Sequence, residues 1–335
     1  MAAIRFAYLN HLEDPVTYFA NGPQITYSGG QLSASNGVAS ITRASGSFIT
    51  DGVKKWALVG GTIASSFPAN TRVSAVAALT LTTTANATGT ASGVNGTLTP
   101  DLALNEDPAY PETNLTNKQR YIPWKTFSIP GGASYDLGSA KSCNCVAALA
   151  HQIMDPTVGG LYNVDIYSAD TWGTWTFRGN IDMLNKRDGG DVFTTVSARY
   201  WKFPMASSGV FSLGGLFLGR TDLAGVGEDL GIQFGPGTAH ATQQPSSTLL
   251  TPSGIPYEFM SPFDRRTWSM RWDALTPSNR QKIETVLKAS RNTRTPVMFD
   301  ESDVPWEIRF VDRRVAWTSV FNTVESMSLD IESLP

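Results

Sequence analysis

Reactive side chains are scarce in this 335-residue chain. It contains two cysteines and three histidines, and His11, His151 and His240 are far apart, without metal-ligand spacing. Cys143 and Cys145 stand in Ser-Cys-Asn-Cys, and no second cysteine pair or histidine-rich segment completes a zinc site. We interpret both cysteines as small buried residues on the same face of a strand, where they are poor disulfide partners. No metal and no cofactor are therefore expected.

Charge is also scarce. Charged residues make up 16% of the chain, and 26 basic against 29 acidic side chains give a net charge of −3. A general nucleic-acid binder needs a basic surface, so we expect no nucleic-acid partner. No run of 18 apolar residues occurs, so we expect no membrane insertion. Residues 1–6 lack the apolar core of a signal peptide, which favours folding in a cytoplasm.

The motifs of common enzyme classes are missing. There is no Gly-x-Ser-x-Gly elbow, phosphate-binding loop or dinucleotide fingerprint. The densest acidic set is Asp300, Glu301 and Asp303, which lacks the twelve-position calcium loop. A glycosidase needs two carboxylates held across a cleft, and we interpret this set as solvated loop residues. His151, in a predicted strand, is interpreted as a satisfied strand residue rather than a catalytic base. The sequence thus predicts no catalytic residues and no enzyme.

What the chain does contain is short alternating segments and many turn residues, with 30 glycines and 19 prolines. Residues 56–100 hold one charged residue, Arg72, whereas residues 264–335 hold eleven of each sign, so the chain is not one uniform repeat. We divide it into four parts. They are an N-terminal strand segment (1–37), a small β-module (38–100), a β-sandwich (101–215) and a C-terminal domain (216–335).

Strand patterns are clearest in the second and third parts. Residues 73–76 and 79–82 alternate apolar and polar side chains, and 40–42 and 48–49 carry strand-forming types. Residues 83–119, rich in Thr, Ala, Asn, Gly and Pro, are interpreted as a long connection. Residues 143–153, 162–167 and 192–203 alternate without intervening helices. This pattern predicts a mainly β fold with an antiparallel β-sandwich.

The C-terminal part combines strands with one helix. Thr276 suits the N-cap, Pro277 suits the first helical position, and Pro296 ends the pattern. Ile283, Val286 and Leu287 form the apolar stripe, while Glu284 and Lys288 form a solvent-side pair. Alternating segments flank the helix: residues 268–272 precede it, and 297–299, 308–310 and 327–331 follow it. An α+β domain with one clear helix is expected.

One aromatic motif leaves two alternatives open. Trp172 and Trp175 stand in Trp-Gly-Thr-Trp after a predicted strand. Exposed tryptophans can stack on sugar rings, so both are candidate carbohydrate-binding residues. Alternatively, one or both fill a core or an interface.

Three segments resemble parts of tailed-phage proteins. Residues 120–219 are similar to the galactose-binding-like jelly roll of phage tail-tip proteins, on Trp124, Tyr135-Asp136-Leu137-Gly138, the strand through His151, Asp165-Ile166-Tyr167-Ser168-Ala169-Asp170, and Ala198-Arg199-Tyr200-Trp201 with Leu216-Phe217-Leu218-Gly219. Residues 264–300 resemble the closing domain of distal or minor tail proteins, on residues 266–272, a Leu-Thr-Pro-Ser-x-Arg helix start and residues 295–299. Residues 38–84 resemble a small β-module recurrent in phage proteins, on residues 43–48, Asp51-Gly52 and 76–81.

The resemblance implies a structural virion protein of the distal tail of a siphophage. Such a protein forms a ring, expected to be a homohexamer, between the tail tube protein and the tail hub and tip proteins that carry receptor-binding parts. The resemblance makes residues 216–335 the expected ring-forming tail domain. The implied partners are copies of the chain, those tail proteins, and tail fibres or a host surface glycan. A carbohydrate-binding adhesin that contacts host glycans is the alternative function. A cell-envelope hydrolase is the third, and it lacks an acid–base set.

Overall fold

The chain is mainly β, with antiparallel sheets and, in the part that the structure describes, one α-helix. The computed structural model describes residues 5–7, 9–13, 18–19, 24–100, 110, 112–116, 123–126, 131–149, 163–183, 188–206, 211–221, 239–243, 246–250, 256–260, 265–291, 296–299, 304–310, 317–321 and 324–333. Within these residues, no helix has the length and apolar character needed to cross a bilayer. The mainly β fold predicted from alternation is confirmed.

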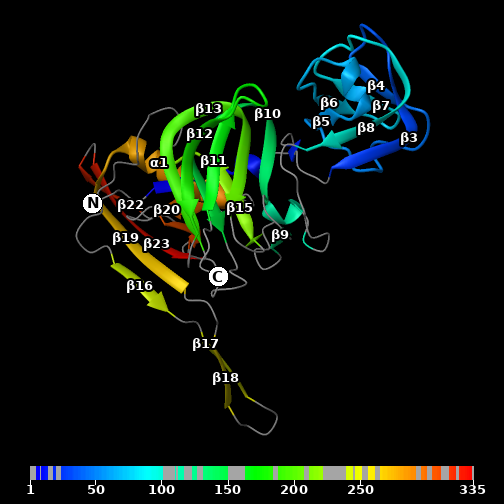
Figure 1. Cartoon of the computed structure of the whole chain (residues 1–335). Coiled ribbons are helices and arrows are strands. Elements are labelled where there is room, and N and C mark those ends of the chain that lie inside the picture. Colours follow the sequence, from blue (N-terminus) through cyan, green and yellow to red (C-terminus); the bar gives the residue numbers. More distant parts are fainter. Residues whose placement is uncertain are drawn as a thin grey trace.

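The small β-module is a six-stranded sheet, shown in blue and cyan in Figure 1. The strand order is β5-β8-β3-β4-β7-β6. The elements are β3 (Ile25–Ala34), β4 (Ser40–Arg43), β5 (Leu58–Gly60), the 3-10 helix η2 (Thr62–Ser66), β6 (Val73–Val76), β7 (Thr80–Thr83) and β8 (Ala91–Thr99). Its core includes Leu32, Ile41, Phe48, Ile63 and Leu81, each fully shielded from solvent.

Two strands of this sheet differ from the sequence-based expectation. β8 lies inside residues 83–119, which were interpreted as a connection, and β3 lies in the segment 1–37 but pairs with β4 and β8. Composition does not indicate β8 as a strand, because four of its nine residues are Thr or Gly. Gly96 is a packing requirement, since a Cβ there would lie 2.6 Å from Ile63 Cγ2 and Leu32 Cδ1. Residues 48–49, expected in a strand, form a turn that buries Phe48 and leaves Ile49 60% exposed.

The central sandwich has a large curved sheet with the strand order β12-β11-β13-β10-β15 (Figure 1). Its strands are β10 (Gly131–Leu149), β11 (Asn163–Ala169), β12 (Thr176–Asp182), β13 (Gly189–Ala206) and β15 (Gly215–Gly219), with β2 (Tyr18–Phe19) paired to β10. A second pair, β9 (Trp124–Thr126) and β14 (Phe211–Leu213), contributes to the same core, and η3 (Glu112–Leu115) adds Leu115. Trp124, Trp201 and Phe203 fill this core, which confirms the antiparallel sandwich.

β10 is buried on both faces, and the two cysteines occupy opposite sides of it. The β10–β13 pairing shifts register between Cys143 and Cys145, so alternation breaks at Asn144. Cys143 packs in the sandwich core, whereas Cys145 packs against Phe217 and Phe299. The same-face placement was therefore wrong, because alternation along β10 breaks where its pairing with β13 shifts register, and no local pattern shows that shift. Their interpretation as small buried residues is confirmed, and burial raises the pKa of the Cys143 thiol.

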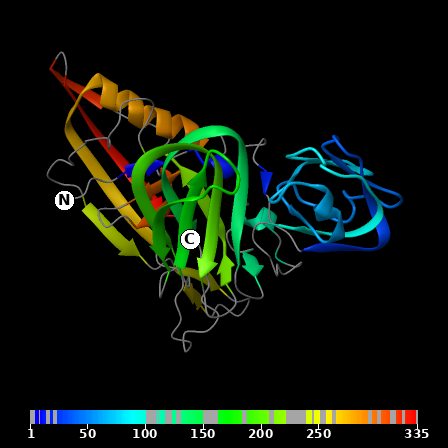
Figure 2. The same cartoon turned by 45° about the horizontal axis from the view of Figure 1, so that its top comes forward.

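The C-terminal unit is a seven-stranded sheet with a helix on it (Figure 2). The order is β1-β20-β21-β23-β19-β16, with β22 also paired to β23. The strands are β1 (Arg5–Ala7), β16 (Ala239–Gln243), β19 (Arg265–Leu275), β20 (Val297–Phe299), β21 (Pro305–Phe310), β22 (Trp317–Phe321) and β23 (Val324–Ser333). The first strand of the chain thus completes a sheet built by its last hundred residues.

The predicted helix is confirmed as α1 (Pro277–Arg291). The carbonyl of Thr276 accepts a hydrogen bond of 3.0 Å from the Arg280 N–H, as an N-cap residue does. Its apolar stripe, Ile283, Val286 and Leu287, is at most 3% exposed and packs on Met270, Met327 and Leu329 among other core residues of the sheet. Glu284 lies 4.0 Å from Lys288, which is the solvent-side pair that the spacing predicts.

Two further connections complete the architecture. The N-terminal segment is fastened to β15 through Asn10, in the turn before the 3-10 helix η1 (His11–Glu13); its side chain donates to the Leu216 carbonyl and accepts from the Leu218 N–H, both at 3.0 Å. A hairpin of β17 (Ser246–Leu250) and β18 (Pro256–Met260) forms a separate two-stranded sheet. It projects away from the other sheets (Figure 1).

Candidate functional site

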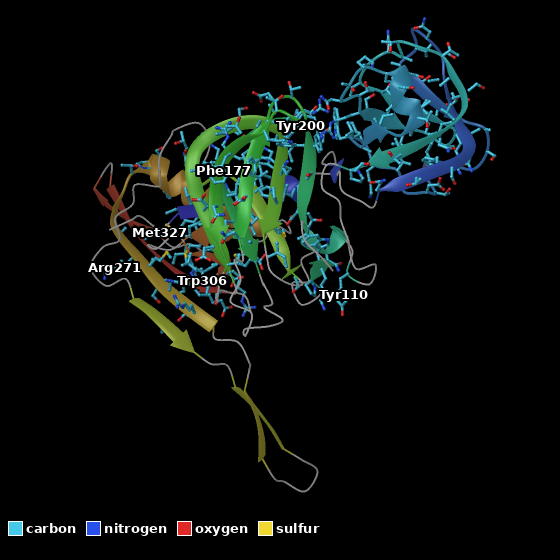
Figure 3. The ribbon with its side chains drawn as sticks, in the orientation of Figure 1. Tyr110, Phe177, Tyr200, Arg271, Trp306 and Met327 are labelled. Atoms are coloured by element: carbon cyan, nitrogen blue, oxygen red, sulfur yellow. The ribbon has the colours of Figure 1, made fainter. Side chains whose placement is uncertain are left out.

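The tryptophan motif lies where the β-module meets the sandwich. Trp172 stacks on Trp56 of the module, with ring centroids 5.2 Å apart and planes 9° apart, and it is 8% exposed. Tyr200 of β13 meets both indoles edge-on; Figure 3 shows it at the end of the sandwich that adjoins the module. Trp175, half-buried, contacts Trp172 edge-on at 5.3 Å. Trp172 is thus an interface residue within the chain, one of the two alternatives open from sequence.

A buried carboxylate joins the same two units. Asp136 of β10 is 1% exposed and accepts two hydrogen bonds from Arg199 of β13, from Nε at 2.6 Å and from a terminal nitrogen at 2.9 Å. From the module, Lys55 Nζ donates to it at 2.9 Å and Trp56 Nε1 donates at 3.1 Å. The Gly138 N–H also donates to it, at 2.9 Å. We call Asp136, Arg199, Lys55 and Trp56 the junction clamp.

The clamp keeps Asp136 ionised. Burial alone would raise the pKa of its carboxyl, but the hydrogen bonds from Arg199 and Lys55 outweigh that effect and lower the pKa to about 2. The same contact raises the pKa of Arg199. Two cations against one carboxylate leave a net positive charge at the junction. Such a cluster is well suited to holding two units together, and a carboxylate with so low a pKa is a weak base at neutral pH.

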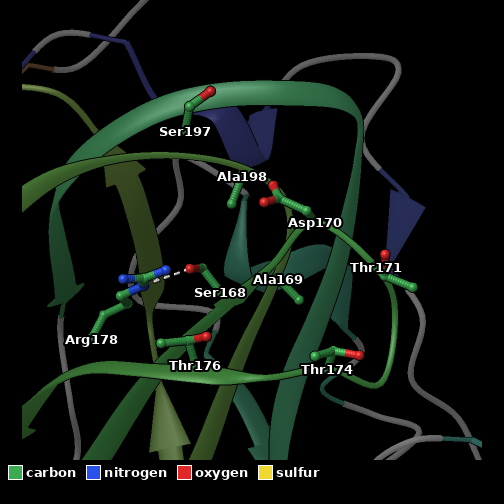
Figure 4. Close-up of a pocket in the computed structure, with 9 residues that line it drawn as sticks. All are labelled: Ser168, Ala169, Asp170, Thr171, Thr174, Thr176, Arg178, Ser197 and Ala198. Atoms are coloured by element: carbon green, nitrogen blue, oxygen red, sulfur yellow. Dashed lines mark hydrogen bonds between the residues drawn. The ribbon is translucent and has the colours of Figure 1, made fainter.

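A polar pocket of about 280 Å³ lies beside this junction, at the ends of β11 and β12 and at the bend of β13. Figure 4 shows the nine lining residues, which are Ser168, Ala169, Asp170, Thr171, Thr174, Thr176, Arg178, Ser197 and Ala198. Its rim is the turn that follows β11, closed by a hydrogen bond of 3.1 Å from the Thr174 N–H to the Thr171 carbonyl. Gly173 takes φ +98° there, a conformation that favours glycine. Trp172, at the centre of the same turn, anchors the rim against Trp56.

The ionisable groups of the pocket are differently constrained. Arg178 donates from Nε to the hydroxyl of Ser168 at 2.7 Å, and Ser168 is fully buried. Asp170 is exposed on the rim, and among the described residues it has no hydrogen-bond or ion-pair partner. The pocket therefore presents one positioned cation, one free carboxylate and several hydroxyls.

Sequence reasoning found the tryptophans but missed the residues around them. Asp136 had a usable signal, because an aspartate within Tyr-Asp-Leu-Gly is a charge in an otherwise apolar stretch. Arg178, Arg199 and Lys55 had none, since surface-type residues in strands and loops are common. Their partners lie 10, 63 and 81 positions away in the chain.

The remaining candidates from sequence add no site. His151, Asp300, Glu301 and Asp303 lie outside the described residues. His11 is buried in η1. The described residues contain no group of three or more His, Cys, Asp or Glu side chains that could hold a metal ion.

Comparison with known proteins gives distant likenesses to part of the chain. No protein-family model matches, and a search of curated proteins finds no match. Among solved structures, SpGH29 is 18% identical over 36% of this chain and 28% of its own, with a TM-score of 0.29, so the chain spans less than a third of it. The third family 32 carbohydrate-binding module of a family 31 glycoside hydrolase from Clostridium perfringens is 15% identical over 34% of this chain and 85% of its own, with a TM-score of 0.29. The family 32 carbohydrate-binding module of C. perfringens NanJ, in complex with galactose, is 17% identical over 34% of this chain and 88% of its own, with a TM-score of 0.28.

Proposed function

We propose that this chain is a non-enzymatic structural subunit of a distal phage tail, which associates with copies of itself into a ring. The observation that carries the proposal is the hairpin β17–β18, which pairs with no other described strand and projects from the body (Figure 1). An isolated two-stranded hairpin is marginally stable in water. A projecting hairpin is therefore best explained by a partner surface, and in a ring that surface belongs to the next subunit.

Two other features support an assembly role. The C-terminal sheet ends in the short edge strand β16, which pairs on one side only, with β19, among the described strands and so leaves an edge for another chain. The low charge content of 16% suits a surface that neighbours cover, because interface cores are depleted of charged residues. The edge strand lies in the unit that resembles the closing domain of tail proteins, whereas the charge content is an average over the whole chain. The tail tube and hub proteins are the proposed partners above and below the ring.

Removing the hairpin tests this proposal. Replacing residues 246–260 with a short Gly-Ser linker is expected to convert a discrete oligomer of the intact chain into a monomer. In this proposal the hairpin β17–β18 makes its contacts with the neighbouring subunit. Analytical ultracentrifugation measures the change, and negative-stain microscopy of the intact chain shows whether the oligomer is a ring. The control is Leu79→Ser, at a residue 49% exposed in the module, which is expected to keep the oligomer.

Two results would contradict the proposal. An intact chain that stays monomeric at high concentration lacks the association on which it depends. A chain without the hairpin that still forms the same ring would show that the hairpin has another role. Mass spectrometry of purified virions tests the placement in the tail separately.

A second candidate function is binding of a host surface glycan, and the polar pocket favours it. Hydroxyls, a carboxylate and a guanidinium in one small concavity suit a polyhydroxylated ligand better than an apolar one. In this proposal Trp172 anchors the rim of the pocket, whereas direct sugar contact by Trp172 or Trp175 stays a prediction.

A glycan array with the intact chain tests the second candidate. Asp170→Ala is expected to weaken binding about tenfold, because a carboxylate accepts charge-assisted hydrogen bonds from sugar hydroxyls. Trp175→Ala is the matched comparison, since its neighbours Thr174 and Thr176 line the pocket and Trp175 does not. Loss with Trp175→Ala alone would identify an aromatic platform instead, and no binding by the intact chain removes this function.

A further inference from the structure

We propose that the polar pocket recognises an acidic sugar unit, with Arg178 binding the carboxylate of the sugar. This inference rests on the second candidate function, glycan binding, and it names the ligand class of that same pocket. The pocket lies on one edge of the sandwich, between β11, β12 and the bend of β13 (Figure 4).

The size and the lining of the pocket restrict the ligand. Small-molecule pockets commonly have volumes of about 300–1,000 Å³ and are mostly apolar. This one, at about 280 Å³, is at the lower limit and is lined mainly by hydroxyl and charged side chains. One sugar ring matches such a volume, and its hydroxyls match such a lining. Apolar or drug-sized ligands match neither.

Arg178 is positioned for a carboxylate. Its Nε donates a hydrogen bond to the hydroxyl of Ser168, which is fully buried, so this contact holds the guanidinium in place. Among the described residues, its two terminal nitrogens have no hydrogen-bond or ion-pair partner. A guanidinium presents its nitrogens as a planar fork that fits the two oxygens of a carboxylate. Because Nε is bonded to Ser168, the edge formed by the two terminal nitrogens is left for a ligand.

Asp170 distinguishes an acidic sugar from other anions. Its carboxylate lines the same pocket as Arg178 and would repel a phosphate or sulfate, whose charge is spread over every face. A sugar acid carries one carboxylate and several hydroxyls, so it can place the carboxylate at Arg178 and donate hydroxyl hydrogens to Asp170. Thr171, Thr174 and Thr176 add neutral hydroxyl partners along the rim.

The test uses two ligands that differ only in the carboxylate. Titration calorimetry or ligand-observed NMR would compare methyl glucuronide with methyl glucoside, and methyl galacturonide with methyl galactoside, on the intact chain. We expect the acidic member of at least one pair to bind at least tenfold more tightly. Arg178→Gln is expected to abolish that preference, while Arg178→Lys keeps part of it, because an ammonium retains the charge without the fork. The control is Arg271→Gln, at an exposed arginine of β19 in the C-terminal sheet (Figure 3).

The outcomes separate this inference from the function on which it rests. Equal binding of acidic and neutral sugars, or a preference that Arg178→Gln leaves unchanged, overturns the assignment of Arg178 and keeps glycan binding. No binding of any sugar by the intact chain removes both and leaves the assembly role untouched. Inorganic phosphate that competes as well as the sugar acid would make this a general anion site, which also overturns the inference. Unchanged circular dichroism of each variant confirms that the fold is kept.

Discussion

Asp136→Asn will loosen the attachment of the β-module to the sandwich. The substitution keeps the size of the side chain but removes the negative charge that Arg199 and Lys55 share. Asp136 is 1% exposed, and removing one partner of a buried charge pair costs about 3–5 kcal/mol. The two cations are partly exposed and can recover some hydration, so the expected loss is about 2–3 kcal/mol.

Two measurements check this result. Urea unfolding gives the loss of stability, and small-angle scattering gives the radius of gyration, which increases if the module swings away. The control is Asp165→Asn, because Asp165 accepts a hydrogen bond from Asn180 at the surface of the same sandwich. The free energy of unfolding is expected to change by less than about 0.5 kcal/mol in the control. Equal behaviour of the two variants would show that the junction clamp does not hold the units together.

The pKa of Asp136 adds a pH dependence to the same prediction. Its folded-state pKa, about 2, is below the ordinary value of 3.8, so the stabilisation is present above pH 4. It is lost as the pH falls from about 4 to about 2, because the clamp then has to bind a proton. The size of this acid-sensitive part is about 2 kcal/mol, at about 1.4 kcal/mol for each pKa unit. Asp136→Asn is expected to remove that part of the acid-induced loss.

Trp172→Ala will produce the second large effect. The indole is 8% exposed and contacts Trp56, Trp175 and Tyr200, so truncation leaves a cavity between the module and the sandwich. Replacing a tryptophan buried to this degree with alanine lowers the free energy of unfolding by about 3–5 kcal/mol. Among the described residues, Trp172 Nε1 is buried without a hydrogen-bond partner, so the stabilisation is apolar and aromatic. Trp172→Phe is therefore expected to keep much of it.

The comparison with Trp175 tells an interface residue from a sugar platform. Trp175 is only half-buried, so Trp175→Ala is expected to cost about 1 kcal/mol in urea unfolding. A double-mutant cycle of Trp172→Ala with Trp56→Ala should give a coupling of about 1 kcal/mol, because the stacked pair is lost only once. Additive effects of the two substitutions would contradict direct stacking. Because Trp172 also anchors the rim of the pocket, Trp172→Ala should indirectly weaken the binding of any ligand in the pocket.

Periodicity determined most of the secondary structure. The alternation in residues 163–167 and 327–331 fixes which side chains enter a core, since successive residues of a strand face opposite sides. The helix α1 was equally predictable from the sequence, because Thr276, Pro277 and the apolar stripe are all local signals. β8 was not, because its Gly96 is required by the side chains that pack on it. Only the positions of Leu32 and Ile63 explain Gly96.

The site depended on information that no local pattern carries. The sequence by itself determined a mainly β chain, poor in charge, with one helix near its end and a tryptophan pair of open role. The tertiary structure decided that Cys143 and Cys145 face opposite sides, that the first strand joins the last sheet, and that Trp172 meets Trp56. The physical reason is that alternation and capping act over a few residues, whereas Asp136 meets Lys55 across 81 positions through burial and charge.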